Sequence, residues 1–447
     1  MTTEMKDSGV KWIGSIPADW EINKIKYIAT LKGRIGWQGL TSDEYTDEGA
    51  YLITGTDFEN GGINWDSCVH VPMRRWEEAR DIQIEDGDLL ITKDGTIGKV
   101  AIVSGCTAPT SLNSGVLRIS TIDGYDRKFL YWVLQSDVFW TWFADKNAGN
   151  STIQHLYQGD FAEFKYAIPP IDEQGVIATL LDSECTKIDS IIDDLERQIE
   201  QLEKYKTSII TEAVTKGTGE KELKESQIEW ANLIPKQWTI ERMQDIAEYK
   251  KGPFGSSVTV DMFVEKGENT YKVYEQKNAI NADSTLGWYY LTERDYRSLQ
   301  DFSVRSGDII VSCAGTIGKC YILPENTEPG IINQALMRVR IKKGFNKKYF
   351  LYLFDVALEY MNEKYSNGSA MKNIPPFSIL KKQSIPVPPP EEQKEIVCYL
   401  DKLCESIQSV LISKKQQLTL MQERKRALIY EYVTGKKRVK EVTSYAD

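Results

Sequence analysis

Two glycine-rich segments hold residues that could bind a phosphate group. The motif Gly-Thr-Ile-Gly-Lys occupies residues 95–99 and returns unchanged at residues 315–319. A nucleotide-binding P-loop requires Gly-x-x-x-x-Gly-Lys-Ser/Thr, in which glycines shape the loop and the final hydroxyl holds magnesium. Here the first glycine position holds Lys93 or Cys313, and neither motif is followed by Ser or Thr. The sequence therefore argues against nucleotide binding at either segment.

An aspartate shortly before each motif could belong to a metal-dependent nuclease. Asp88 and Lys93 would form the acid-plus-lysine cluster that such a site uses. The second segment keeps the acid as Asp308 but has Cys313 in place of the lysine. The alternative is an acid that closes a turn before a strand. We favour the turn, and a nuclease with a site of another pattern stays open.

Other catalytic and metal-binding patterns are missing from the sequence. There is no Gly-x-Ser-x-Gly nucleophile elbow. The two Pro-Pro pairs nearest to an amino-methyltransferase motif, at residues 169–170 and 375–376, lack the preceding acid or amide. The seven cysteines form no Cys-x-x-Cys pair, and only His70 and His155 accompany them, so a four-ligand zinc site is not expected. We expect reduced, mostly buried thiols and a non-catalytic chain.

The bulk composition indicates a globular protein of two or three domains. The chain has 447 residues, 41% of them hydrophobic, and a single core rarely grows past about 300 residues. It has no apolar run of about 18 residues and no signal peptide at its start, so we expect a cytoplasmic protein without a membrane segment. The net charge of −10 excludes a basic arm that coats nucleic acid, but not recognition by a few placed side chains.

The sequence contains one module written twice. The pattern Trp-x-x-x-Ile-Pro-x-x-Trp returns in the second half, as do the Gly-Asp-apolar block and the Pro-Pro-x-Asp/Glu-Glu-Gln block. The paired positions are 12–20 and 230–238, 87–91 and 307–311, and 169–174 and 388–393. Between these blocks the loops differ, as in residues 34–39 against 251–256 and 52–57 against 273–278. One scaffold with two unlike loop sets suggests two related but non-identical ligands.

A long amphipathic helix follows each globular segment. Apolar residues recur at steps of three and four from Ile177 to Ile209 and from Ile396 to Leu428, which is typical of a coiled-coil face. Each helix of about 40 residues would span on the order of 60 Å. We expect the two helices to pair with each other. Antiparallel pairing would relate the two modules by a pseudo-two-fold axis.

The predicted fold class is therefore α+β. Two mixed α/β globular domains would be separated by two long helices that form an antiparallel coiled coil. The expected boundaries are residues 7–170 and 217–389 for the two domains, 171–216 for the central helix, 390–434 for the C-terminal helix and 435–447 for a tail.

With these blocks in view, the chain resembles the DNA-specificity subunit of a type I restriction–modification enzyme. The resemblance covers nearly the whole chain. It implies two target-recognition domains that each read one half of a bipartite site in double-stranded DNA, with the helix pair setting the spacer. It further implies two methyltransferase subunits that bind S-adenosylmethionine, and motor–nuclease restriction subunits that use ATP and magnesium. No cofactor would reside in this chain.

The residues expected to contact DNA are loop residues with guanidinium, ammonium, amide or hydroxyl groups, the groups that pair with base edges and phosphates. Thr and Lys residues shared by both copies suit phosphates, and the unlike residues suit bases. In the first copy the candidates are Arg34, Gln38, Lys93, Thr96, Lys99, Asn113, Ser114, Asn150 and Gln154. In the second they are Lys251, Ser256, Gln276, Lys277, Asn278, Thr316, Lys319, Asn333, Gln334 and Lys372.

Four helix residues are the candidates for docking the methyltransferase subunits. They are Gln174 and Asp182 in the central helix, and Gln393 and Asp401 in the C-terminal helix. Residues 172–215 carry 11 acidic and 4 basic side chains, whereas residues 391–434 carry 7 of each. A docking surface and a merely solvated face both explain the acidic helix. The alternative function is a coiled-coil adaptor whose globular ends bind proteins.

Overall fold

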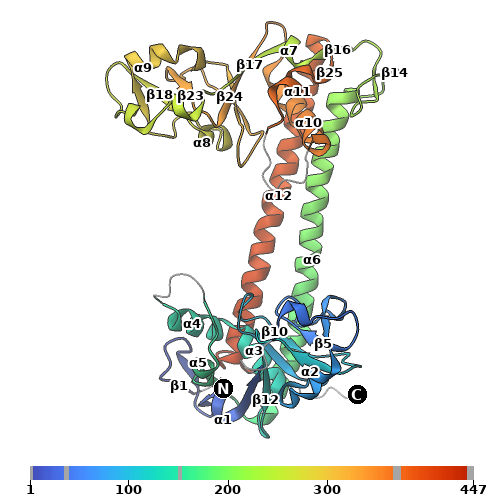
Figure 1. Cartoon of the computed structure of the whole chain (residues 1–447), viewed down its shortest axis with the longest axis vertical. Helices are drawn as coiled ribbons and strands as arrows, with labels where there is room; N and C mark the ends of the chain where they lie inside the picture. Colours follow the sequence, from blue (N-terminus) through green and yellow to red (C-terminus); the bar gives the residue numbers. More distant parts are fainter. Residues whose placement is uncertain (1–3, 35–39, 149–153, 366–373, 440–447) are drawn as a thin grey trace. The chain divides into compact units, whose positions relative to one another are not determined.

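The computed structural model describes residues 4–34, 40–148, 154–365 and 374–439, and it confirms the α+β class. The chain divides into two compact units, the first made of residues 1–196 and 415–447 and the second of residues 197–414. Two long helices, α6 (Ile171–Lys216) and α12 (Pro390–Val433), each contribute one half to either unit (Figure 1). Each unit therefore combines one globular domain with half of both helices.

The globular part of the first unit is built on two sheets. A four-stranded antiparallel sheet has the order β10 (Val100–Ile102), β9 (Leu89–Thr92), β12 (Val116–Thr121) and β4 (Ala29–Gly33). A three-stranded sheet has the order β11 (Thr110–Leu112), β5 (Ala50–Ile53) and β8 (Val69–Val71), in which β11 and β5 run parallel. Three strand pairs complete it: β1 (Met5–Asp7) with β2 (Ser15–Pro17), β3 (Glu21–Lys24) with β13 (Lys165–Ile168), and β6 (Phe58–Glu59) with β7 (Gly62–Ile63).

Five short helices accompany these sheets: α1 (Ile25–Ile28), α2 (Met73–Glu77), α3 (Arg127–Gln135), α4 (Asp137–Lys146) and α5 (Gln158–Ala162). The two neighbouring helices α3 and α4 begin at side chains that cap them. Asp126 accepts a hydrogen bond from the backbone N–H of Phe129, and Ser136 accepts one from that of Val138. Such caps satisfy N–H groups that have no partner inside the helix.

Strand β9 separates two hydrophobic cores. Leu89 and Ile91 point into the core next to the long helices, whereas Leu90 points into a second core on the other face of the sheet. Successive side chains of a strand alternate between faces, so a strand with both faces covered reads as a continuous apolar run. The same alternation occurs in β21 of the second unit, where Ile309 and Val311 face one core and Ile310 the other.

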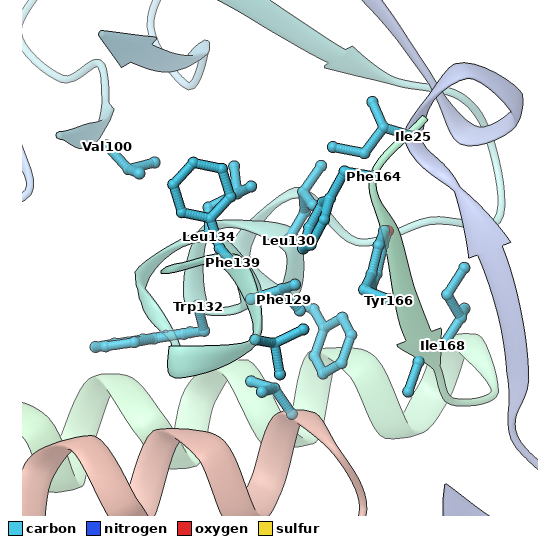
Figure 2. Close-up of a cluster of buried hydrophobic side chains, with 14 of the residues drawn as sticks. Ile25, Val100, Phe129, Leu130, Trp132, Leu134, Phe139, Phe164, Tyr166 and Ile168 are labelled. Carbon is cyan, nitrogen blue, oxygen red and sulfur yellow. The ribbon is translucent and has the colours of Figure 1, made fainter. Parts of the chain in front are cut away.

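Aromatic side chains fill the core that joins the first domain to the helices. Figure 2 shows Phe129, Phe139, Phe164 and Tyr166 gathered above the ribbons of α6 and α12. Trp20 belongs to the same core, and its ring meets that of Phe129 edge-on at a centroid distance of 6.5 Å. Large rings in such arrangements contribute most of the buried apolar area of a small core.

Within the first unit, the beginning of α6 packs against the end of α12. Ile177 and Leu181 share a core with Ile429 and Val433. The Lys425 ammonium also contacts the Asp189 carboxylate at 2.6 Å. Because early residues of one helix meet late residues of the other, the two halves run antiparallel, as predicted.

The second unit repeats the plan of the first. One four-stranded sheet has the order β17 (Ala247–Lys251), β24 (Leu336–Ile341), β21 (Ile309–Ser312) and β22 (Cys320–Ile322). The other has the order β19 (Tyr290–Thr292), β18 (Thr270–Tyr274), β23 (Gly330–Ile332) and β20 (Ser303–Val304). Strands β18 and β23 are parallel, like β5 and β11. The strand pairs are β14 (Leu223–Glu225) with β15 (Leu233–Pro235) and β16 (Thr239–Arg242) with β25 (Ser384–Val387). The helices are α7 (Met243–Ile246), α8 (Gln276–Ile280), α9 (Glu293–Ser298), α10 (Lys347–Tyr365) and α11 (Phe377–Lys382).

The helix halves of the second unit are also antiparallel. Ile209 and Val214 near the end of α6 share a core with Ile396 and Leu400 near the start of α12. Further along, the Lys206 ammonium donates a hydrogen bond to the Gln408 side chain at 3.5 Å. Each unit thus uses the beginning of its own helix and the end of the other, which follows from the duplication in the sequence.

Candidate nucleic-acid interface

The candidate residues of the first unit lie on loops that meet at one edge of the domain. Because β5 and β11 run parallel, their carboxyl ends lie at the same edge, and residues 54–57 and 113–115 follow those ends directly. The backbone N–H of Asn113 donates to the carbonyl of Ile53 at 2.9 Å, which joins the two loops.

The Gly-Thr-Ile-Gly-Lys motif forms a hairpin that completes this edge. Gly95 and Gly98 have φ of +69° and +78°, a region that suits glycine. The Thr96 hydroxyl donates to the carbonyl of Gly55 at 3.0 Å, and the N–H of Lys93 donates to the carbonyl of Gly115 at 2.8 Å. The motif therefore serves as a turn, and its hydrogen bonds join the hairpin to the loops of residues 54–57 and 113–115 in one surface.

Residues 154–157 close the group on its remaining side. The backbone N–H of Leu156 donates to the carbonyl of Lys93 at 3.0 Å, and His155 Nδ1 lies 2.6 Å from a carboxylate oxygen of Asp94. We call residues 54–57, 93–99, 113–115 and 154–157 the first loop cluster.

The second unit builds the same surface from its own residues. The N–H of Asn333 donates to the carbonyl of Tyr274 at 3.0 Å, and the N–H of Cys313 to that of Ala335 at 2.8 Å. The Gln276 amide donates to the carbonyl of Thr316 at 3.3 Å, so it occupies the bridging role of the Thr96 hydroxyl. Residues 251–257, 275–278, 313–319 and 333–335 are the second loop cluster.

Most described candidates present polar groups to solvent on these clusters. In the first cluster the exposed or half-buried candidates are Lys93, Thr96, Lys99, Asn113, Ser114 and Gln154. In the second they are Lys251, Gln276, Lys277, Thr316, Lys319, Asn333 and Gln334. Gln38, Asn150, Lys372 and the side chain of Ser256 lie outside the described residues.

Two candidates are buried structural residues, which corrects the prediction for them. Arg34 is only 5% exposed, because its guanidinium donates to the carbonyl of Leu112 and the hydroxyl of Ser111, both at 2.8 Å. Asn278 is 0% exposed and donates to the carbonyls of Asp283 and Leu286 at 2.9 and 2.8 Å. Both side chains satisfy buried backbone oxygens and cannot reach DNA in this structure.

Exposed aromatic rings in or near these loops were not among the candidates. Phe254 and Trp288 in the second unit and Tyr157 in the first are all strongly exposed. By contrast, Trp20 and Trp238 are buried in their cores and Trp12 and Trp230 pack against them, as expected of packing residues. An aromatic residue inside a Gly-, Pro- and Ser-rich loop is a signal that could have identified Phe254 from the sequence.

The aspartates before the hairpins have structural roles. Asp88 is 4% exposed; it accepts a hydrogen bond from the N–H of Glu85 at 2.9 Å and contacts the Arg118 guanidinium at 3.1 Å. Asp308 closes the equivalent turn and binds Arg340 through two hydrogen bonds of 2.8 Å. Among the described residues no group of three or more His, Cys, Asp or Glu side chains could hold a metal ion. Both aspartates accept a backbone N–H within a turn, the role favoured from the sequence.

The four docking candidates bind residues of their own unit. Gln174 accepts from the N–H of Asp126 at 2.7 Å and donates to the carbonyl of Pro169 at 2.9 Å, so its buried amide fixes the start of α6 against the domain. Gln393 makes the equivalent bonds to Asn346 and Pro388. These two glutamines are therefore closed to a partner in this structure.

Asp182 and Asp401 are also engaged, but at the surface. Asp182 accepts from the Trp132 indole at 2.9 Å and from Lys128 at 3.0 Å. Asp401 accepts from the Tyr352 hydroxyl and from Lys348, both at 2.8 Å. Burial acts to raise the pKa of Asp401, but the hydrogen bonds from Lys348 and Tyr352 together outweigh it and hold that pKa below its usual range. Their partial exposure leaves these two carboxylates accessible.

Comparison with known proteins agrees with this duplicated architecture. Residues 17–204 and 235–420 match the type I restriction modification DNA specificity domain. The chain is 26% identical over 442 residues to a putative type I restriction enzyme MjaX specificity subunit of Methanocaldococcus jannaschii, covering 96% of both chains. It is 25% identical over 440 residues to the MjaVIII specificity subunit of the same organism, covering 95% of this chain and 94% of the relative.

The fold has a counterpart among solved structures. A chain from a study of complex assembly and conformational transition of the type I R-M system superposes with a TM-score of 0.70 at 14% sequence identity, covering 94% of this chain and 99% of that one. The match in sequence over both repeats, together with the shared fold, settles the family. The protein belongs to the type I restriction–modification DNA-specificity family.

Proposed function

We propose that the two loop clusters read the two halves of a bipartite DNA target. The main observation behind this proposal is that the two loop clusters share one backbone arrangement, the frame, but carry different side chains on it. After β5 the frame holds Thr54 and Thr56, and after β18 it holds Gln276 and Lys277. A frame of fixed geometry with variable polar groups is what recognition of two different base sequences requires.

Residues shared by the two clusters would contact phosphates, and residues that differ between them would contact bases. Thr96 and Lys99 recur as Thr316 and Lys319 at the same places of the hairpin, and all four are exposed. Contacts that both clusters keep suit the phosphate backbone, which is the same at every sequence. Ser114 and Gln334, which occupy equivalent loop positions with different side chains, suit base edges.

The long helices would set the distance between the half-sites and dock the partner subunits. Support comes from the antiparallel packing in each unit and from the family, whose specificity subunits act within larger enzymes. We expect two methyltransferase subunits that bind S-adenosylmethionine and methylate adenine, and restriction subunits that use ATP and magnesium. Asp182 and Asp401 remain accessible for docking. The chain itself would catalyse no reaction.

The expected location is the cytoplasm, where DNA and these partners are present. No helix within the described ranges has the length and apolar character needed to span a membrane.

The test is selection from DNA that is randomised over about 20 base pairs, roughly two helical turns. The chain would be incubated with and without the adenine methyltransferase subunit of its host. We expect enrichment of a bipartite motif and methylation of that motif only when both proteins are present. If no sequence is enriched under any condition, the proposal fails and a protein-binding adaptor becomes the better explanation.

A further inference from the structure

The second loop cluster carries an apolar side chain that the fold does not use. Phe254 is 86% exposed, although a phenylalanine of a monomeric globular protein normally gains free energy by burial. Its neighbours along the chain are anchored, since Pro253 is buried and Val258 packs in a core with Val273. The ring is thus exposed although the residues on both sides of it are anchored.

The backbone holds this position rigidly beside the candidate polar residues. The N–H of Gly252 donates to the carbonyl of Leu336 at 2.9 Å. A Cβ atom at Gly252 would lie 1.8 Å from the carbonyl oxygen of Asn333 and 3.1 Å from the Cα of Gln334, so only glycine permits this approach. After Phe254 along the chain, the N–H of Ser257 donates to the carbonyl of Phe254 at 2.8 Å and closes the turn η5 (Gly255–Ser257).

Phe254 therefore lies two residues after a backbone position that touches a loop with groups suited to base edges. The loop of Asn333 and Gln334 lies directly against residue 252, and exposed Lys251 precedes it. The amide and ammonium groups of these residues match the acceptor and donor pattern of the major groove. In that groove the one apolar feature is the 5-methyl group of thymine, which apolar side chains recognise by contact.

We infer that Phe254 is a specificity-determining residue of the second recognition domain and reads a thymine through its 5-methyl group. The inference rests on the proposed function, because it assigns one base contact within the proposed DNA surface. It explains why an exposed ring is held on a loop that glycine and proline fix in place. In the first repeat the aligned position is Trp37, also aromatic, which lies outside the described residues.

The experiment removes the methyl group and the ring separately. The full chain, with its methyltransferase partner, would bind duplexes that carry the selected site, and each thymine in turn would be replaced by deoxyuridine. For the wild-type chain we expect about fourfold weaker binding at one thymine of one half-site, the effect of one buried methyl group. For Phe254→Ala we expect roughly tenfold weaker binding to the unmodified site and no further loss on that replacement.

A matched variant separates this contact from general loss of apolar surface. Val260 is 80% exposed on the neighbouring turn η6 (Val260–Met262), and Val260→Ala should leave the deoxyuridine effect at its wild-type size. Both substitutions remove exposed side chains, so thermal unfolding of the chain should stay unchanged.

The outcomes distinguish this inference from the function on which it rests. If a bipartite site is selected and methylated but Phe254→Ala keeps the full deoxyuridine effect, Phe254 does not read thymine and the proposed function stands. Phe254 likewise does not read thymine, and the proposed function stands, if replacing each thymine by deoxyuridine leaves the binding of the wild-type chain unchanged. If no site is selected at all, the proposed function fails, and this inference fails with it.

Discussion

Arg438 binds Glu173 through two parallel hydrogen bonds, from Nε to Oε1 at 2.9 Å and from Nη2 to Oε2 at 2.6 Å. The same carboxylate accepts a hydrogen bond from the indole of Trp20 at 3.1 Å. In the second unit Glu392 accepts from the indole of Trp238 at 2.8 Å and binds Lys221. The segment after α12 therefore closes the first unit in the way that the segment after α6 closes the second.

Replacing Arg438 by Ala should destabilise the first unit. The change removes a bidentate charged pair and leaves the half-buried Glu173 carboxylate with the indole of Trp20 as its remaining partner among these contacts. We expect the free energy of unfolding to fall by about 2 kcal/mol, measured by calorimetry of the full chain. Lys394→Ala is the control, since its exposed pair with Glu391 should contribute less than about 0.5 kcal/mol. Equal losses in both variants would contradict a structural role for Arg438.

Removing one lysine from each hairpin should weaken DNA binding without changing the preferred sequence. Lys99 and Lys319 are exposed at equivalent positions, so both suit phosphate contacts. For Lys99→Ala or Lys319→Ala the slope of log K against log salt concentration should become shallower by about 0.9. Binding titrations at several salt concentrations measure this slope. A change of preferred base in either variant would instead assign that lysine to base contact.

Replacing Gln334 should alter one half of the selected motif and leave the other half intact. The Gln334 side chain is exposed on the second loop cluster, next to Asn333. An amide that pairs with adenine contributes roughly 1–3 kcal/mol of discrimination, so Gln334→Ala should relax the preference at one base pair by that amount. Selection with the variant chain shows which positions change. Ser114→Ala is the partner experiment and should affect only the opposite half-site.

The overall architecture could be predicted because it depends on patterns that are local in the sequence. The three-and-four spacing from Ile177 to Ile209 specifies a helical stripe whatever surrounds it, and the structure has that helix as α6. The repeated blocks then required two similar units. The Gly-Thr-Ile-Gly-Lys motif lacks the hydroxyl and the first glycine of a P-loop in the sequence itself, and in the structure it forms the turn between β9 and β10.

Individual contact residues could be predicted less accurately, because the tertiary fold decides which side chains are exposed. Arg34 and Asn278 have the right chemistry for DNA, but their donor groups bind backbone carbonyl oxygens, of the distant Leu112 for Arg34 and of the nearby Asp283 for Asn278. Gln174 and Gln393 occupy the same place in the repeated motif, which makes them docking candidates from the sequence. The sequence does not show that the backbone N–H groups of Asp126 and Asn346 would face them. These glutamines and their partners are separated by tens of residues, and no local pattern identifies the contact.

The seven cysteines should differ sharply in reactivity. Burial raises the pKa of the thiols of Cys68, Cys185 and Cys313 to about 12, so they stay protonated at neutral pH, whereas Cys398 is exposed on α12. Brief iodoacetamide treatment at pH 8, read by mass spectrometry, should label Cys398 first and the buried three only after unfolding. Because their folded pKa lies above the unfolded value near 9, their contribution to stability is intact below pH 9 and is lost as pH rises toward 12. Rapid labelling of Cys68 in the folded chain would contradict this.

Two glycines of one loop offer the sharpest test of how the second loop cluster is held. In Gly252→Ala the new methyl group would collide with the backbone oxygen of Asn333, which cannot move without displacing the polar loop beside it. We expect a loss of about 1–3 kcal/mol in stability together with weaker DNA binding. Gly255→Ala adds the same methyl group three residues away, where no atom lies within 4 Å and φ is not positive, so it should be neutral. Calorimetry and binding to the selected site, on both variants, measure the two effects. If Gly252→Ala binds DNA like the wild type, the contact between these loops does not position the surface that reads DNA.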